Sequence, residues 1–316
     1  MADVHTHAPD DHDSAYAGLL VNDAHWAFGT DFEDPLAGVD TTVPAGVDAA
    51  ALATYCLMLG DDALVMSQRL IEWASRAPDL EEDIALANIA LDLLGQARLL
   101  LARAAAADPT LVPDLPEGSP VPPEDRLAFF RDHLAFRNVR LAELPKGDFA
   151  EAIVRILMFA TWRLALFERL RGSQDAVLAA VAAKGVKELA YHRDFAGRWF
   201  VTLAQGTDES RRRLVAALTG LWPLWDELFA PHETELCVAR TGVGVDPATV
   251  AGEVYAILAH VLATAGVERP DAQPLAGLRA GTRGGLRGRD GLHTEHLSRM
   301  LAQMQSVARE HPLGTW

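Results

Sequence analysis

The chain has 316 residues, half of them hydrophobic, and carries a formal net charge of −16. This length and composition exclude a wholly disordered protein and allow one or two domains with a substantial core. The negative charge repels phosphate backbones and anionic lipids, so we expect neither nucleic-acid nor membrane binding. No uncharged apolar run approaches the ~18 residues of a membrane span. The cysteines, Cys56 and Cys237, lie far apart and form no metal-binding or disulfide motif, which favours a cytoplasmic location.

Residues 1–45 are rich in His, Asp, Gly and Pro and show no sustained periodicity. This composition is typical of a flexible extension. Histidines alternate with acids there, but no spacing defines a metal site. We therefore predict a flexible N-terminal extension over 1–45 and a single helical domain over 46–316.

Apolar residues recur at helical spacing over 47–74 and again over 79–107, and the two segments are separated by Pro78. Asp79, followed by Glu82, predicts a capped start for the second helix. The second helix also carries one apolar row that steps by four and three, formed by Leu80, Ile84, Ala87, Leu91 and Leu94. Two helices of this length predict a long antiparallel hairpin.

A second pair of long helices is predicted over 149–171 and 175–203, with Ser173 as a plausible cap between them. Five prolines between 111 and 123 mark a connection, which a helix over 124–142 follows. Further helices are predicted over 209–229, 247–265 and 290–309, and no period-two strand pattern is sustained. The fold class is therefore all-α: a ferritin-like four-helix bundle with additional C-terminal helices.

Active ferritin-like bundles hold two metal ions with a Glu from each of two helices and a Glu-x-x-His pair from each of the others. Here the second long helix offers Asp92, but the position three residues later is Gly95. In the fourth, Leu189 stands three residues before His192, and Glu188 stands four before it. The first helix has Glu72 as its late acid, and the third has no acid between Glu151 and Glu168. These residues predict a degenerate site in which Asp92, Glu188 and His192, with Lys184 or Arg163 nearby, form an ion-pair cluster.

Four stretches of the sequence carry a resemblance to a known family: residues 64–73, residues 83–98 (DIALANIALDLLGQAR), KELAYH at 187–192 and GLHTEHL at 291–297. Together they resemble the C subunits of bacterial phenylacetyl-CoA epoxidases, over roughly residues 50–316. The resemblance implies a subunit without a working metal site in a monooxygenase complex of phenylacetate catabolism. It also implies iron in a catalytic A subunit, a small B subunit and an iron–sulfur flavin reductase as partners, and no cofactor in this chain.

The one basic cluster of the sequence lies among glycines near the C-terminus and consists of Arg279, Arg283, Arg287 and Arg289. Arginine beside mobile glycine suits phosphate recognition, so we weigh an acyl-CoA contact at the boundary between subunits against a solvated loop or a partner contact. His293, Glu295 and His296 follow, and we interpret them as a capped helix start.

Two hypotheses follow. The first is a non-catalytic structural subunit of the epoxidase, which should keep some apolar helix surface for its catalytic partner and can form a homodimer when alone. The alternative is a stand-alone di-metal carboxylate oxidase that uses Glu72, Asp92, Glu188 and His192. A metal-storage protein would need a site that this sequence lacks.

Overall fold

A computed structural model of the chain describes residues 38–271 and 287–314, and every regular element within these ranges is helical. All described helices belong to one compact unit, which begins at Val39. That unit begins before the predicted boundary at residue 46, since Arg103 donates to the carbonyls of Thr41 and Thr42 at 2.6 and 3.2 Å. The predicted extension otherwise falls outside the described residues.

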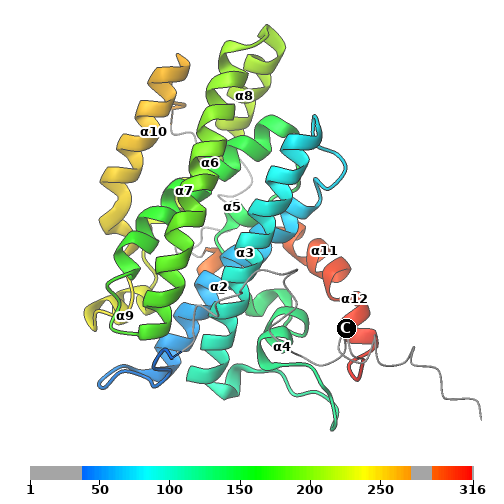
Figure 1. Ribbon diagram of the computed structural model, residues 1–316, viewed down its shortest axis with the longest axis vertical. Coiled ribbons are helices and arrows are strands. Elements are labelled where there is room, and N and C mark those ends of the chain that lie inside the picture. Colours follow the sequence, from blue (N-terminus) through cyan, green and yellow to red (C-terminus); the bar gives the residue numbers. More distant parts are fainter. Residues whose placement is uncertain (1–37, 272–286, 315–316) are drawn as a thin grey trace, which may run out of the picture. The chain divides into compact units, whose positions relative to one another are not determined.

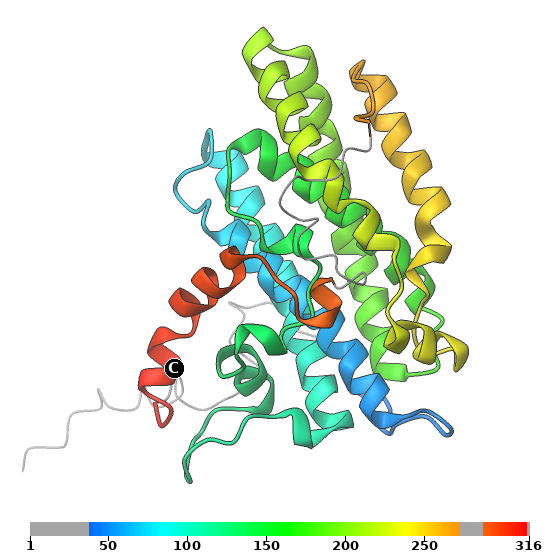
Figure 2. The same cartoon turned by 180° about the vertical axis from the view of Figure 1, so that it is seen from behind.

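The core is built from two long helical hairpins, α2 (Ala49–Ile71) with α3 (Leu80–Ala107) and α6 (Phe149–Leu170) with α7 (Ala176–Gln205). The hairpins pack against each other through α3 and α7 (Figures 1 and 2). Each of these helices begins at an aspartate whose side chain accepts backbone N–H groups of the first turn: Asp48, Asp79, Asp148 and Asp175. The predicted all-α, ferritin-like bundle is confirmed. Ser173 is not the cap; its hydroxyl donates to the Val243 carbonyl.

The connection between the hairpins differs from the single helix predicted over 124–142. It contains η1 (Pro109–Leu111), α4 (Pro123–Phe129), η2 (His133–Ala135) and the one-turn α5 (Arg140–Glu143). The backbone N–H of Arg137 donates to Asp61 at 2.9 Å, and that of Val139 donates to Asp62 at 2.8 Å. Because these two buried carboxylates on α2 accept the N–H groups of Arg137 and Val139, residues 136–139 are extended where the sequence predicted a helix.

The remaining helices pack around the bundle, and Figure 2 shows α10 beside the second hairpin. They are α8 (Asp208–Leu221), η3 (Trp222–Leu224), η4 (Asp226–Phe229), α9 (Glu233–Arg240), η5 (Pro247–Val250), α10 (Ala251–Ala265), η7 (Gly288–Asp290), α11 (Glu295–Met304) and α12 (Ser306–Glu310). The helix predicted over 209–229 stops at Leu221 and continues only as short 3-10 turns around Pro223. The helix predicted over 290–309 starts at Glu295, and α9 was not predicted.

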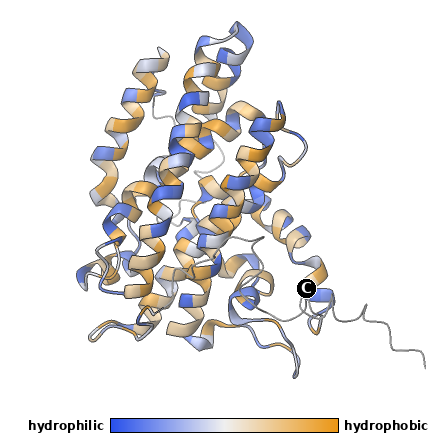
Figure 3. Cartoon of the chain, viewed as in Figure 1, coloured by the Kyte–Doolittle hydropathy of each residue, from blue (hydrophilic) through white to orange (hydrophobic). Residues whose placement is uncertain are grey.

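The apolar row predicted on α3 does not form its buried face. The side chains that pack inside the bundle include Leu86, Ile89, Leu93, Leu100 and Leu101. The predicted row instead faces outward, with exposed fractions of 68% for Leu80, 52% for Ile84, 60% for Leu91 and 40% for Leu94. Helix α3 is therefore apolar on two faces, and Figure 3 shows apolar residues along much of its length.

Three helical segments are long and apolar enough to cross a membrane by length and composition: Ala49–Ile71, Leu80–Ala107 and Pro247–Ala265. The first two are the paired helices of the first hairpin, and their most apolar windows are 78% and 50% buried inside the protein. Packing in the bundle thus accounts for much of this apolar character.

Two glycines of α7 provide a test of this packing. A Cβ at Gly185 would lie 2.7 Å from two ring carbons of Phe167, whereas a Cβ at Gly197 would meet nothing within 4 Å. Gly185→Ala should lower the free energy of unfolding by about 1–3 kcal/mol, since the buried Phe167 ring must move. Gly197→Ala should raise it by about 0.5–1 kcal/mol through helix propensity. Urea unfolding followed by circular dichroism measures both; equal effects would contradict the close approach of α6 and α7.

Candidate functional site

The residues predicted as a degenerate metal site meet where α3 packs against α7. His192 Nε2 lies 2.9 Å from Asp92 Oδ2, and this hydrogen bond joins the two hairpins. The His192 side chain is 1% exposed, while that of Asp92 is 36% exposed and borders the surface. Asp92 and His192 thus contact each other directly, as an interhelical pair.

Glu188 lies one helical turn from His192 and has different partners. The side-chain amide of Gln96 donates to Glu188 Oε2 at 2.9 Å, and Lys184 Nζ lies 3.4 Å from Glu188 Oε1. The predicted ion-pair cluster therefore exists, but as two adjacent pairs, Asp92–His192 and Glu188–Lys184. Gln96 was missed by the sequence reasoning because an amide is not a metal ligand of choice in such bundles.

Arg163, on α6, extends this cluster into the middle of the bundle. Its Nε donates to Gln96 Oε1 at 3.0 Å and its Nη1 to the Leu59 carbonyl at 3.1 Å. The guanidinium carbon lies 4.4 Å from the centroid of the Phe167 ring, and the residue is completely buried. Burial lowers the pKa of Arg163 to about 10, partly offset by the Asp62 carboxylate, so the side chain remains a cation at neutral pH.

The arrangement does not fit a di-metal centre. Gly95 supplies no ligand, and a Cβ there would lie 4.0 Å from Lys184 Nζ, while Leu189 is fully buried and has no ligand atom. Within residues 38–271 and 287–314, three or more ligand atoms close enough to share an ion are found in a single acidic group, the largely exposed Asp79, Glu81 and Glu82. A buried guanidinium beside Gln96 and Glu188 would also repel a metal cation placed there.

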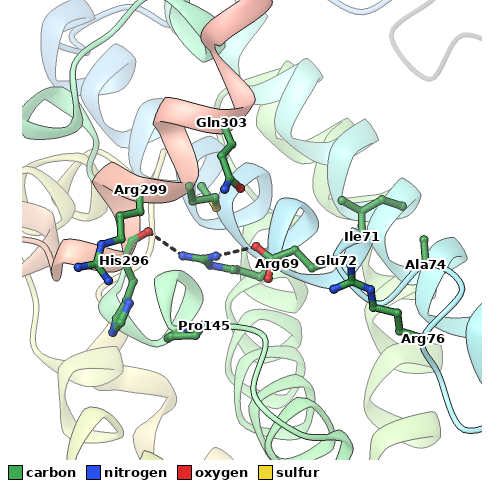
Figure 4. A pocket seen from close by; sticks show the side chains of 10 residues that line it. Arg69, Ile71, Glu72, Ala74, Arg76, Pro145, His296, Arg299 and Gln303 are labelled. Carbon is green, nitrogen blue, oxygen red and sulfur yellow. Dashed lines mark hydrogen bonds and ion pairs between the residues drawn. The ribbon is translucent and has the colours of Figure 1, made fainter.

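Glu72, the remaining ligand candidate, belongs to a separate surface pocket of about 580 Å³. As Figure 4 shows, its carboxylate faces Arg69, whose Nη1 donates to Glu72 Oε1 at 2.6 Å. Arg69 also donates to the carbonyls of Glu143 and His296, at 3.0 and 2.7 Å. Glu72 therefore anchors an arginine that ties α2 to the C-terminal segment.

Arg289 joins the C-terminal segment to the bundle by its contacts with Asp62 of α2. It is one of the four arginines that the sequence analysis considered as acyl-CoA or partner contacts. Arg289 is 3% exposed and holds both oxygens of Asp62, at 2.8 and 3.0 Å, with Glu235 at 3.5 Å. Burial lowers the pKa of Arg289, but the Asp62 and Glu235 carboxylates outweigh it and leave the pKa above its ordinary value. Arg289 is thus a structural ion-pair partner with no group free for an external ligand.

Arg287 is half-buried and is held by contacts within the protein. Its guanidinium donates to the carbonyls of Ala230 and Pro231, and its backbone N–H donates to Asp290 at 2.8 Å. Arg279 and Arg283 lie outside the described residues, so the predicted acyl-CoA or partner contact rests on them.

Three further buried pairs join segments that are far apart in the sequence. Asp61 binds Arg131, with the longer of two hydrogen bonds at 3.1 Å, and Asp175 binds Arg103, with the longer at 3.1 Å. His293 Nδ1 lies 2.8 Å from Glu143 Oε2, and both side chains are buried. The sequence did not predict these pairs, because the two partners of each pair lie 70 to 150 positions apart.

The Asp62–Arg289 pair allows a quantitative test. Asp62→Ala should lower the free energy of unfolding by about 3–5 kcal/mol, because it leaves a buried guanidinium without its main counter-charge. Adding Arg289→Met to that variant should restore part of the loss. Arg198→Ala, which breaks an exposed pair with Asp194, serves as the control and should cost less than about 1 kcal/mol. Equal losses in the buried and exposed variants, measured by urea unfolding, would contradict this account.

Comparisons with known proteins agree with the resemblance found in the sequence. The family model described as phenylacetic acid catabolic protein matches residues 38–316. The C subunit of the 1,2-phenylacetyl-CoA epoxidase of Escherichia coli (strain K12) is 42% identical over 265 residues, which cover 84% of this chain and 99% of that protein.

Proposed function

The chain belongs to the phenylacetic acid catabolic protein family, and we propose that it is the non-catalytic structural subunit of a phenylacetyl-CoA epoxidase. In this role it binds and supports an iron-bearing catalytic subunit of the same fold, together with a small B subunit. The cytoplasmic location predicted from the sequence is part of the same proposal.

One observation carries the proposal: a buried arginine cation lies beside the residues that would have to bind metal. Arg163 bonds to Gln96, and Gln96 bonds to Glu188, so two potential oxygen donors are used within the protein. Asp92 and His192 are likewise bonded to each other. A family member with these contacts lacks the ligand set that oxygen activation by two metal ions requires.

The alternative is that the chain is a di-metal oxidase in its own right, which requires the same residues to be free to bind metal. It would need Glu72, Asp92, Glu188 and His192 to converge on shared ions. Glu72 pairs instead with Arg69 in the surface pocket. This hypothesis is therefore disfavoured by geometry and by the ligand types present.

A metal measurement separates the two hypotheses. The chain purified alone from iron-supplemented cells should hold far less than one iron per chain by elemental analysis. The reason is that Asp92 and His192 bond to each other, while Glu188 and Glu72 are held by basic or amide side chains. When it is purified with the catalytic subunit, iron should follow that subunit. A content near two irons per chain in the isolated protein would overturn the proposal.

A second test uses the assembled complex. The variant Glu188→Gln/His192→Gln should leave phenylacetyl-CoA epoxidation within about twofold of the unsubstituted complex, since neither side chain takes part in the reaction. Folding is checked by circular dichroism, and assembly is checked by co-purification with the catalytic subunit. Loss of turnover in a correctly assembled complex would show that this chain supplies catalytic groups.

A further inference from the structure

We infer that the outer faces of α3 and α7 form the surface that binds the catalytic subunit, an inference that rests on the proposed function and assigns that partner a location. The docking face consists of the exposed apolar row of α3, Leu80, Ile84, Leu91 and Leu94, together with Tyr191, Lys184 and Lys187 of α7.

The first argument is the distribution of apolar residues on α3. This helix already buries a complete inner face in the bundle, yet its outer face carries four large apolar side chains that are 40–68% exposed. A second apolar face of this kind on the outside of a bundle marks a surface that a partner covers. Exposed large apolar residues recur along α3 at spacings of three, four and seven, so they form one continuous row.

The second argument is continuity with α7. Asp92 bonds to His192, and Lys184 Nζ lies 4.0 Å from where a Cβ on Gly95 would stand, so the two helices run side by side without an intervening element. Tyr191 is 45% exposed next to this contact and stacks on Phe195, at 6.4 Å between ring centroids. The α7 part of the face therefore adds an aromatic anchor of the kind that is enriched in protein interfaces.

The third argument is size. The exposed row of α3 runs over 15 residues, from Leu80 to Leu94, and is about 22 Å long at about 1.5 Å per residue. With α7 at a usual interaxial distance of about 8–10 Å, the two outer faces span roughly 400 Å² over this length. This is about half of the area that each partner buries in a stable protein–protein interface, so the docking face forms the centre of a larger contact.

Charge selects the partner. The chain has a net charge of −16, but the α7 edge of the docking face carries exposed Lys184 and Lys187. Two copies joined here would bring together two strongly negative chains. Lys184 is already paired with Glu188 within the chain, so Lys187 is the lysine of this edge that an acidic group of a partner would meet. A different subunit with long helices and an acidic group at this position suits both the apolar row and Lys187.

The experiment compares the full chain with three variants in binding to the catalytic subunit of its own epoxidase. Leu91→Glu and Leu94→Glu place a charge in the apolar row, and Val215→Glu on α8, at a side chain that is 40% exposed, is the matched control. We expect Kd to rise by at least about 30-fold for the two row variants and by less than about threefold for the control. Circular dichroism checks that all variants fold, and hydrogen exchange of residues 80–98 should slow on binding in the unsubstituted chain.

The outcomes separate the inference from the proposed function. If the unsubstituted chain does not bind the catalytic subunit, the proposed function is wrong. If it binds, and the row variants bind equally well without slowed exchange in α3, only the docking face is wrong. If the row variants instead abolish self-association in light scattering, or sedimentation with phosphatidylcholine–phosphatidylglycerol vesicles, and leave Kd unchanged, the face serves a second copy or a membrane and the inference is overturned.

Discussion

The structure depends on how buried carboxylates are neutralised inside an apolar bundle. A carboxylate removed from water must be paired and hydrogen-bonded, or it would destabilise the fold by several kcal/mol. Asp61, Asp62 and Asp175 are completely buried, and each is held by an arginine from a remote segment. These pairs join the crossover, the C-terminal segment and both hairpins, so the positions of all these parts follow from the positions of three aspartates.

Arginine also occupies the interior where metal-binding proteins of this architecture would carry cations. A guanidinium supplies one fixed positive charge and directional donors, which suits structural pairing, but it exchanges no electrons and binds no oxygen. Arg163, with Gln96 and the Leu59 carbonyl, gives the bundle centre a covalently attached cation. This arrangement supports the proposed role, which is that of a subunit with the shape of a ferritin-like enzyme but without its chemistry.

The sequence predicted the fold well because helix periodicity and aspartate caps are local signals. The bounds of α3 and α6 agree closely with the predicted ones, and Asp79 caps as expected. The prediction failed where a distant group decides local structure: Asp61 and Asp62 extend the segment around Val139, which local propensity alone makes helical. The outward apolar row of α3 was found, but periodicity cannot tell which of two apolar faces points inward.

For the site, the Asp92–His192 contact and the neighbouring Glu188 match the predicted cluster. The roles of Gln96 and of the buried Arg163 could not be predicted, because they depend on contacts between helices that are far apart in the sequence.

The contact between Asp62 and Arg289 has a consequence for synthesis of the protein. The two residues are 227 positions apart, so at a translation rate of roughly 5–20 residues per second Asp62 waits about 10–45 s for its partner. During this time the first hairpin holds a carboxylate that its own segment cannot neutralise, and the bundle cannot close completely. Nascent chains that do not yet include residue 289 are therefore expected to be more open to proteases and chaperones than chains that include it.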